Sequence, residues 1–200
     1  MKLLWSSRSP FARKVTIAAH ELGIADRIAI ERVVVSMADP SRDVMRLNPL
    51  ARIPALILDD GVVLHDSRVI IEYLDVTFGG GLLPPAGEAR WRALMLQALA
   101  DGLMESDLRW LEESRLDPLQ RREPYVASMK AKIAAGLDSI EAAPPSAVTV
   151  GEIALGSALA HLDFRFPGDP WRPSRPKLGA WFEAFAARPS MVATKFVDQY

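Results

Sequence analysis

The stretch GGGLLPPAG at residues 79–87 constrains the fold of this chain more than any other part of its sequence. Three consecutive glycines and two consecutive prolines can extend neither a helix nor a central strand, because glycine is conformationally flexible and proline lacks a backbone N–H. Before this stretch the sequence contains short β-branched runs, whereas after it apolar residues recur at helical spacing. We therefore predict two domains, residues 1–78 and 88–200, joined by a linker over 79–87.

The first domain is predicted to be α/β. Alternating or β-branched apolar runs indicate strands, and apolar residues three or four positions apart indicate helices. The expected elements are strands at 2–6, 27–35, 55–58 and 62–65 and helices at 11–22, 41–47 and 67–78. The first two strands should be parallel, because a helix connects them, whereas the last two flank the hairpin signal Asp60-Gly61. This order predicts a mixed four-stranded sheet covered by helices.

The second domain is predicted to be an all-α bundle. Its helices are expected at about 88–114, 120–142, 150–164 and 176–187. Thr149 and Glu152 have the spacing of a capping box, in which each side chain binds the backbone N–H of the other residue at the start of a helix.

Composition excludes several classes of function. Lysine and arginine total 24 against 25 aspartates and glutamates, so no charge excess predicts binding to nucleic acid or to an anionic membrane. Cysteine is absent, which excludes disulfides and a cysteine nucleophile. The three histidines, His20, His65 and His161, are far apart, and we expect no metal site. No apolar run reaches the length of a membrane span, and we expect a cytoplasmic protein.

Three segments at predicted helix and strand starts could carry chemistry. Ser9-Pro10 precedes the first helix, Ile53-Pro54 precedes the third strand, and Asp66-Ser67 opens the third helix. Each has a purely structural explanation, because Ser and Asp are favoured helix caps and proline is tolerated at the start of a strand. The same positions can also bind anions at helix N-termini or, if the Ile53-Pro54 bond is cis, offer backbone groups to a ligand.

In this order, on a β-α-β-α-β-β-α frame followed by helices, the three segments resemble the glutathione S-transferase family. VTVGEIALGSALAHLDFRF and LGAWFEAFAARPSM are similar to two helices of that family's second domain, so the likeness covers essentially the whole chain. The resemblance implies a thioredoxin-like first domain that binds glutathione and a helical second domain that contributes the electrophile pocket. It also implies a homodimer, with glutathione as co-substrate and no further cofactor.

The resemblance assigns a role to each segment. Ser9 would donate a hydrogen bond to the glutathione sulfur and stabilise its thiolate, with Ser6 and Ser7 as rival hydroxyls. Ile53, beside a cis Pro54, would pair its backbone with the cysteinyl part of glutathione. The remaining contacts would be made by Asp66 and Ser67 at the γ-glutamyl end and by Arg52 at the glycine carboxylate. The family more often has Glu where this chain has Asp66, and Lys or Gln where it has Arg52.

The second substrate is the least predictable part of the site. A small hydrophobic electrophile would bind near Phe11 and a set of residues on the 88–114 helix, namely Asp101, Met104, Glu105 and Trp110. A core role for Met104 and Trp110 is at least as plausible. We predict a glutathione transferase of detoxifying type. The alternatives are a glutathione-dependent peroxidase, reductase or isomerase, and a non-catalytic ligand-binding or assembly protein of the same fold.

Overall fold

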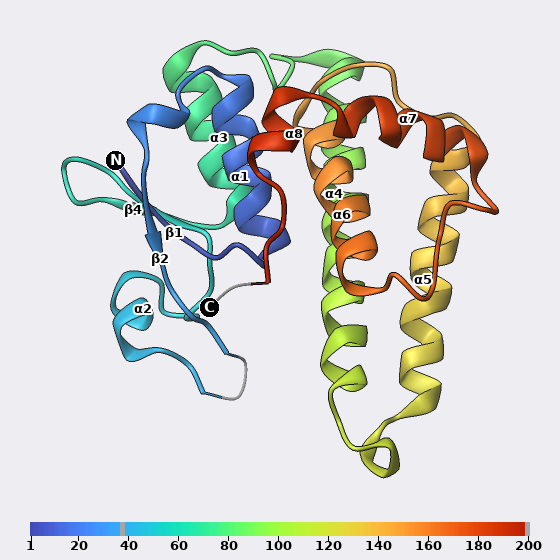
Figure 1. Ribbon diagram of the computed structural model, residues 1–200. Coiled ribbons are helices and arrows are strands. Elements are labelled where there is room, and N and C mark those ends of the chain that lie inside the picture. Colours follow the sequence, from blue (N-terminus) through green and yellow to red (C-terminus); the bar gives the residue numbers. More distant parts are fainter. Residues whose placement is uncertain (37–38, 199–200) are drawn as a thin grey trace. The chain divides into compact units, whose positions relative to one another are not determined.

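The computed structural model describes residues 1–36 and 39–198, which fall into two compact units (Figure 1). The first unit combines Met1–Arg90 with the segment that begins at Pro189, and the second spans Trp91–Arg188. The sequence analysis assigned residues 88–200 to a single helical domain. In the structure, residues 189–198 instead belong to the first unit.

A four-stranded mixed sheet forms the centre of the first unit, as predicted. Its strands are β1 (Lys2–Trp5), β2 (Ala29–Arg32), β3 (Ala55–Ile57) and β4 (Val63–Leu64), in the spatial order β2-β1-β3-β4. β1 and β2 are parallel, and β3 is antiparallel to both of its neighbours. The helical crossover and the Asp60-Gly61 turn therefore determine strand direction as expected, and Gly61 has the positive φ of 87° that such a turn requires.

Helices cover both faces of this sheet. α1 (Pro10–Glu21) and α3 (Ser67–Phe78) pack side by side against one face (Figure 1). On the other face α2 (Arg42–Leu47) contributes Val44 to a cluster that includes Leu4 of β1. Leu3 and Leu4 point to opposite faces, because side chains alternate along a strand, and both are fully buried. This explains why β1 is an uninterrupted apolar run.

The predicted linker begins as an ordered extension of α3. The helix ends at Gly79, which has a left-handed φ of 69°. The buried carboxylate of Asp75 then accepts hydrogen bonds from the backbone N–H groups of Leu82 at 2.7 Å and Leu83 at 2.9 Å. Both leucines are buried. The start of the linker is thus held on the first unit through backbone hydrogen bonds to one side chain.

The second unit is helical. It contains most of α4 (Gly87–Ser114) together with α5 (Glu123–Glu141), α6 (Val150–Arg165) and α7 (Pro176–Ala186). The predicted capping box opens α6: Glu152 accepts from the Thr149 N–H at 2.8 Å, and the Thr149 hydroxyl accepts from the Gly151 N–H at 3.1 Å. Within residues 1–36 and 39–198, no helix is long and apolar enough to cross a membrane.

Residues 189–198 are called the C-terminal segment. This segment begins with the short helix α8 (Pro189–Ala193), which was not predicted. It is held by Arg13 of α1, which donates to the Met191 carbonyl at 3.1 Å and to the Thr194 hydroxyl at 3.4 Å. The Arg13 guanidinium also lies 4.4 Å from the centre of the Phe196 ring. These contacts explain why the segment belongs to the first unit, although it follows the last helix of the second.

Candidate functional site

Ser9 is the N-cap of α1. Its φ of −86° and ψ of 118° are extended, and its Oγ accepts a hydrogen bond from the Ala12 N–H at 3.2 Å. Pro10 occupies the first helical position, where its missing N–H has no consequence. The half-buried Ser9 hydroxyl thus accepts one bond from the helix and keeps its own proton available to an acceptor in front of the helix.

The rival hydroxyls in the same loop have other partners. Ser7 is buried, and its Oγ accepts from Arg32 Nη2 at 3.1 Å. The Ser6 Oγ accepts from the Arg8 N–H at 3.4 Å. Of the three serines, only Ser9 stands at the N-terminus of the helix, where backbone N–H groups and the helix dipole favour a negative charge.

The peptide bond between Ile53 and Pro54 is cis. Both residues are buried and lie immediately before β3. Across the described ranges 1–36 and 39–198, neither the N–H nor the C=O of Ile53 forms a hydrogen bond with the protein. Both backbone groups are therefore available to an extended ligand, which could pair with them as a neighbouring strand would.

Asp66 and Ser67 open α3. Asp66 is the N-cap, exposed to solvent, and its Oδ1 accepts from the Arg68 N–H at 2.9 Å, which leaves Oδ2 without a protein partner in the described chain. Ser67 is buried, with 2% of its surface exposed, and its hydroxyl makes no hydrogen bond to any residue that the structure describes. A carboxylate, a hydroxyl and the helix N-terminus together present both signs of charge to a ligand.

Strand pairing brings these three segments to one edge of the sheet. In the antiparallel β1–β3 pair, Leu4 lies opposite Ala55, so the cis proline before β3 lies beside the end of β1, where the Ser9 loop starts. In the β3–β4 pair, Leu64 lies opposite Leu56, so the chain that leaves β4 for α3 passes the same edge. Elements more than 50 residues apart in the sequence therefore converge at the carboxyl end of β1.

The remaining predicted residues are more scattered. Arg52 is exposed beside the cis proline, and its side chain forms no hydrogen bond or ion pair within the described residues. Phe11 lies in the first turn of α1 and is half-buried. On α4, Glu105 is exposed, whereas Asp101 and Met104 are 2% and 0% exposed. Burial of Met104 agrees with the core interpretation of that residue.

Trp110 has a packing role within the second unit. Its ring stacks on Phe166 with the centroids 3.5 Å apart, and the Lys130 ammonium lies 4.6 Å from the Trp110 ring centre. The sequence analysis left this residue open between a core role and a pocket wall, and these contacts favour the core role.

The sequence analysis missed a buried hydrogen-bonded pair in the second unit. Asp107 of α4 and His161 of α6 are both completely buried, and the Asp107 Oδ2 lies 2.8 Å from the His161 Nδ1. Burial raises the pKa of Asp107, although the neighbouring His161 and Arg165 lower it. The two residues are 54 positions apart in the sequence, so no spacing rule could have paired them.

Across residues 1–36 and 39–198, acidic and histidine side chains form no cluster of three or more suited to a metal ion.

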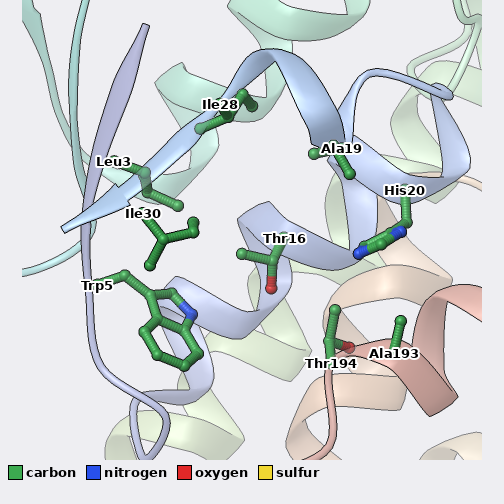
Figure 2. A pocket seen from close by; sticks show the side chains of 10 residues that line it. Leu3, Trp5, Thr16, Ala19, His20, Ile28, Ile30, Ala193 and Thr194 are labelled. Atoms are coloured by element: carbon green, nitrogen blue, oxygen red, sulfur yellow. The ribbon is translucent and has the colours of Figure 1, made fainter. Parts of the chain in front are cut away.

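A pocket of about 170 Å³ lies in the first unit, between α1, strands β1 and β2 and the C-terminal segment (Figure 2). Its wall is mostly apolar. The lining consists of Leu3, Trp5, Thr16, Ala19, His20, Ala25, Ile28, Ile30, Ala193 and Thr194. None of the residues predicted to bind glutathione belongs to this lining, so the pocket is separate from the edge where the three segments converge.

The fold is that of a thioredoxin-like domain followed in the sequence by a helical domain. The chain matches the family model for the glutathione S-transferase N-terminal domain over residues 8–77 and that for the C-terminal domain over residues 89–184. The chain belongs to the glutathione S-transferase family.

Solved structures and curated proteins agree with this assignment. A glutathione transferase family member from Pseudomonas fluorescens Pf-5, crystallised with bound glutathione, is 40% identical, with a TM-score of 0.94 over 97% of this chain and 98% of that one. A second crystal structure of that family member contains S-(propanoic acid)-glutathione.

Among the curated proteins, the uncharacterized GST-like protein YibF of Escherichia coli strain K12 is 29% identical over 202 residues, which are 98% of each chain. A stringent starvation protein A homolog from Histophilus somni is 38% identical over 97 residues, covering 46% of this chain and 45% of the other. These relatives have different names, and family membership alone does not define the activity.

Proposed function

We propose that this protein is a glutathione transferase, which binds glutathione at the edge formed by Ser9, Ile53 and Ser67 and ionises its thiol. The observation that carries the proposal is that the Ser9 hydroxyl can take part in two hydrogen bonds at once. It accepts one from the Ala12 N–H as the cap of α1, and it retains a proton to donate. A hydrogen bond to the thiolate, with no equal bond to the thiol, lowers the thiol pKa.

Helix α1 adds to this effect. Its N-terminal N–H groups carry a partial positive charge, which stabilises an anion by about 0.3–1 kcal/mol, and by more where the site is partly buried. A charge-assisted hydrogen bond contributes about 1.5–3 kcal/mol. Because one pKa unit corresponds to about 1.36 kcal/mol, the two effects together can lower a thiol pKa by roughly one to three units.

The rest of the tripeptide would be bound by main-chain and charged groups. The unpaired N–H and C=O of Ile53 would bind the cysteinyl residue next to the cis Pro54. Asp66 would bind the γ-glutamyl ammonium, and the Ser67 hydroxyl with the α3 N-terminus would bind its carboxylate. Arg52 would reach the glycine carboxylate as a solvent-exposed cation. In support, the relative from Pseudomonas fluorescens Pf-5 was crystallised with glutathione.

In the transfer step the thiol proton leaves to solvent, and the thiolate attacks an electrophilic carbon, forming a C–S bond. The electron pair either remains on the adduct, which takes up a proton, or departs with a leaving group. We propose that the second substrate is a small hydrophobic electrophile. The proposal includes a homodimer that acts in detoxification in the cytoplasm.

Two other functions are alternatives. A peroxidase, reductase or isomerase would use the same thiolate, and a different second substrate would distinguish it. An assembly or ligand-binding role would need no thiolate.

The test is glutathione binding by calorimetry, combined with the absorbance of the bound thiolate near 240 nm as a function of pH. We expect wild type to bind glutathione with a thiol pKa below that of the free tripeptide. Ser9→Ala should raise the bound thiol pKa by about one unit or more, because the donated hydrogen bond is lost. Ser9→Thr, which retains a capping hydroxyl, and Ser6→Ala are the matched controls and should leave it nearly unchanged.

Conjugation of a panel of apolar electrophiles by wild type then separates a transferase from the alternatives. If glutathione does not bind, the proposed function is wrong. If it binds with an unperturbed thiol pKa, the assembly or ligand-binding role is favoured. If Ser6→Ala raises the thiol pKa and Ser9→Ala does not, the role assigned to Ser9 is wrong.

A further inference from the structure

The C-terminal segment contacts the loop that carries Ser9. The backbone N–H of Val197 donates a hydrogen bond to the Ser7 carbonyl at 3.2 Å. Next to it, the Asp198 carboxylate lies 3.6 Å from the guanidinium of Arg8. Two adjacent residues near the end of the described chain thus meet two adjacent residues of the loop, about 190 positions earlier in the sequence, roughly as a short strand would.

The loop itself is a tight turn. The Ser9 N–H donates to the Ser6 carbonyl at 3.1 Å, which closes a four-residue turn with Ser7 and Arg8 at its centre. On its other side the turn is held by Arg32, which donates to the Ser7 hydroxyl at 3.1 Å. Restraining Ser7 therefore restrains the residue that ends the turn, Ser9, from which α1 begins.

The C-terminal segment is itself anchored to α1 by Arg13. Arg13 is almost completely buried and donates to Met191 and Thr194, and its guanidinium carbon lies 4.4 Å from the centre of the Phe196 ring. Burial lowers the pKa of Arg13 to about 10, so the side chain remains charged at neutral pH. A buried cation with these partners holds the segment in one position, because each lost partner would leave the charge poorly solvated.

We propose that the C-terminal segment is a positioning element for the glutathione site: its Val197 N–H holds the Ser6–Ser9 turn so that the Ser9 hydroxyl points at the bound sulfur. This inference rests on the proposed function for its catalytic part. Catalysis depends on such placement, since a displacement of about 1 Å can cost as much as a hundredfold in rate. Val197 and Arg13 are thus positioning residues that act through Ser9 without touching the substrate.

The test compares Val197→Pro, which removes the N–H donor, with Val197→Ala, which keeps it. Val197 is 40% exposed, so truncation of its side chain alone should have little effect. One net hydrogen bond contributes about 0.5–1.5 kcal/mol, which predicts that opening of the turn becomes between about twofold and about tenfold more frequent in Val197→Pro. Amide hydrogen exchange of Ser9 without glutathione measures this directly, because that N–H closes the turn.

The second readout is the pKa of the bound glutathione thiol, with kcat and KM for glutathione. We expect Val197→Pro to raise the thiol pKa and to lower kcat by up to about tenfold, while KM changes less, because the Ile53 and Ser67 contacts remain. Phe196→Ala, which weakens the anchor at Arg13 but leaves the Val197 N–H in place, should shift both readouts in the same direction by a smaller factor.

The outcomes separate this inference from the proposed function. If Ser9 exchange is equally slow in Val197→Pro and Val197→Ala, the segment does not hold the turn and the inference is wrong, whether or not glutathione binds. If exchange accelerates but the thiol pKa and kcat stay at wild-type values, the positioning role is wrong. If exchange accelerates and wild type does not bind glutathione, the proposed function fails, and the positioning role fails with it.

Discussion

The buried pair of Asp107 and His161 makes a strong prediction about stability. Neither side chain is accessible to solvent, and their contact of 2.8 Å is the hydrogen bond that compensates the carboxylate for its lost hydration. The other oxygen, Oδ1 of Asp107, is buried without a hydrogen-bond partner in the described residues. Removing the imidazole therefore leaves a buried carboxyl group with no hydrogen-bond donor among the described residues.

We expect His161→Phe to lower the free energy of unfolding by about 3–5 kcal/mol at neutral pH, the usual loss when one partner of a buried pair is removed. The double variant His161→Phe with Asp107→Ala also removes the carboxylate. Alanine is smaller than aspartate, so the core is not overpacked, and the small cavity costs only about 1 kcal/mol or less. The double variant should therefore be more stable than the single one, although it differs from wild type at two buried positions.

The difference between these two variants should depend on pH with a definite sign. Burial raises the pKa of Asp107 in the folded protein, and losing His161 removes an interaction that lowers it. The native state then holds a proton that the unfolded chain, with a carboxyl pKa of about 3.9, has already released. Stability therefore falls as pH rises from the unfolded pKa to the raised native one, and the disadvantage of the single variant should vanish toward pH 4 and below.

Urea unfolding followed by circular dichroism, at one protein concentration and at pH values from 4 to 8, measures both effects. A single variant as stable as the double at pH 7 would refute this account, because a buried carboxylate without its partner could not then be the source of the loss. A difference that grows on acidification would refute the linkage argument, since it requires a native pKa below that of the unfolded chain.

Two further substitutions test packing and the linker. Gly151→Ala would place a methyl group 2.7 Å from the Ala93 carbonyl oxygen. Because a backbone atom cannot move without cost, we expect the free energy of unfolding, measured by heat or urea, to fall by about 1–3 kcal/mol. Gly102→Ala, whose Cβ would meet open space, is the control. Asp75→Asn replaces one of two buried acceptor oxygens by a donor, which should leave the N–H of Leu82 or Leu83 unpaired and cost about 1–3 kcal/mol by the same measurement.

Local chemistry explains why so much of the fold could be predicted. Helix starts were marked by residues whose side chains act within three positions, as at Ser9 and Thr149, and the structure shows both caps. Strand direction followed from connection length and from the turn at Asp60-Gly61, which are also local properties. The position of the C-terminal segment was not predicted, because it depends on Arg13, a basic residue within a helix whose burial no periodicity indicates.

The candidate site could be predicted for a different reason. Its three segments are individually weak signals, and the family resemblance supplied their combination. Strand register then places them at one edge, which is a property of the fold rather than of any single residue. The contacts that sequence analysis missed, such as Asp107 with His161 and Ser7 with Val197, join residues 54 to 190 positions apart, and they depend on packing that the hydrophobic pattern does not specify.

The capping and catalytic interpretations of Ser9 are compatible because they use different atoms of one hydroxyl. The lone pair of Oγ binds the Ala12 N–H, and accepting that bond polarises the O–H and improves it as a donor. A substitution that keeps the cap but lacks a donor, Ser9→Asp, should therefore preserve helix α1 and abolish thiolate stabilisation, since a carboxylate accepts from Ala12 but repels the sulfur anion. The cap that the structure shows and the proposed catalytic role can therefore be tested separately.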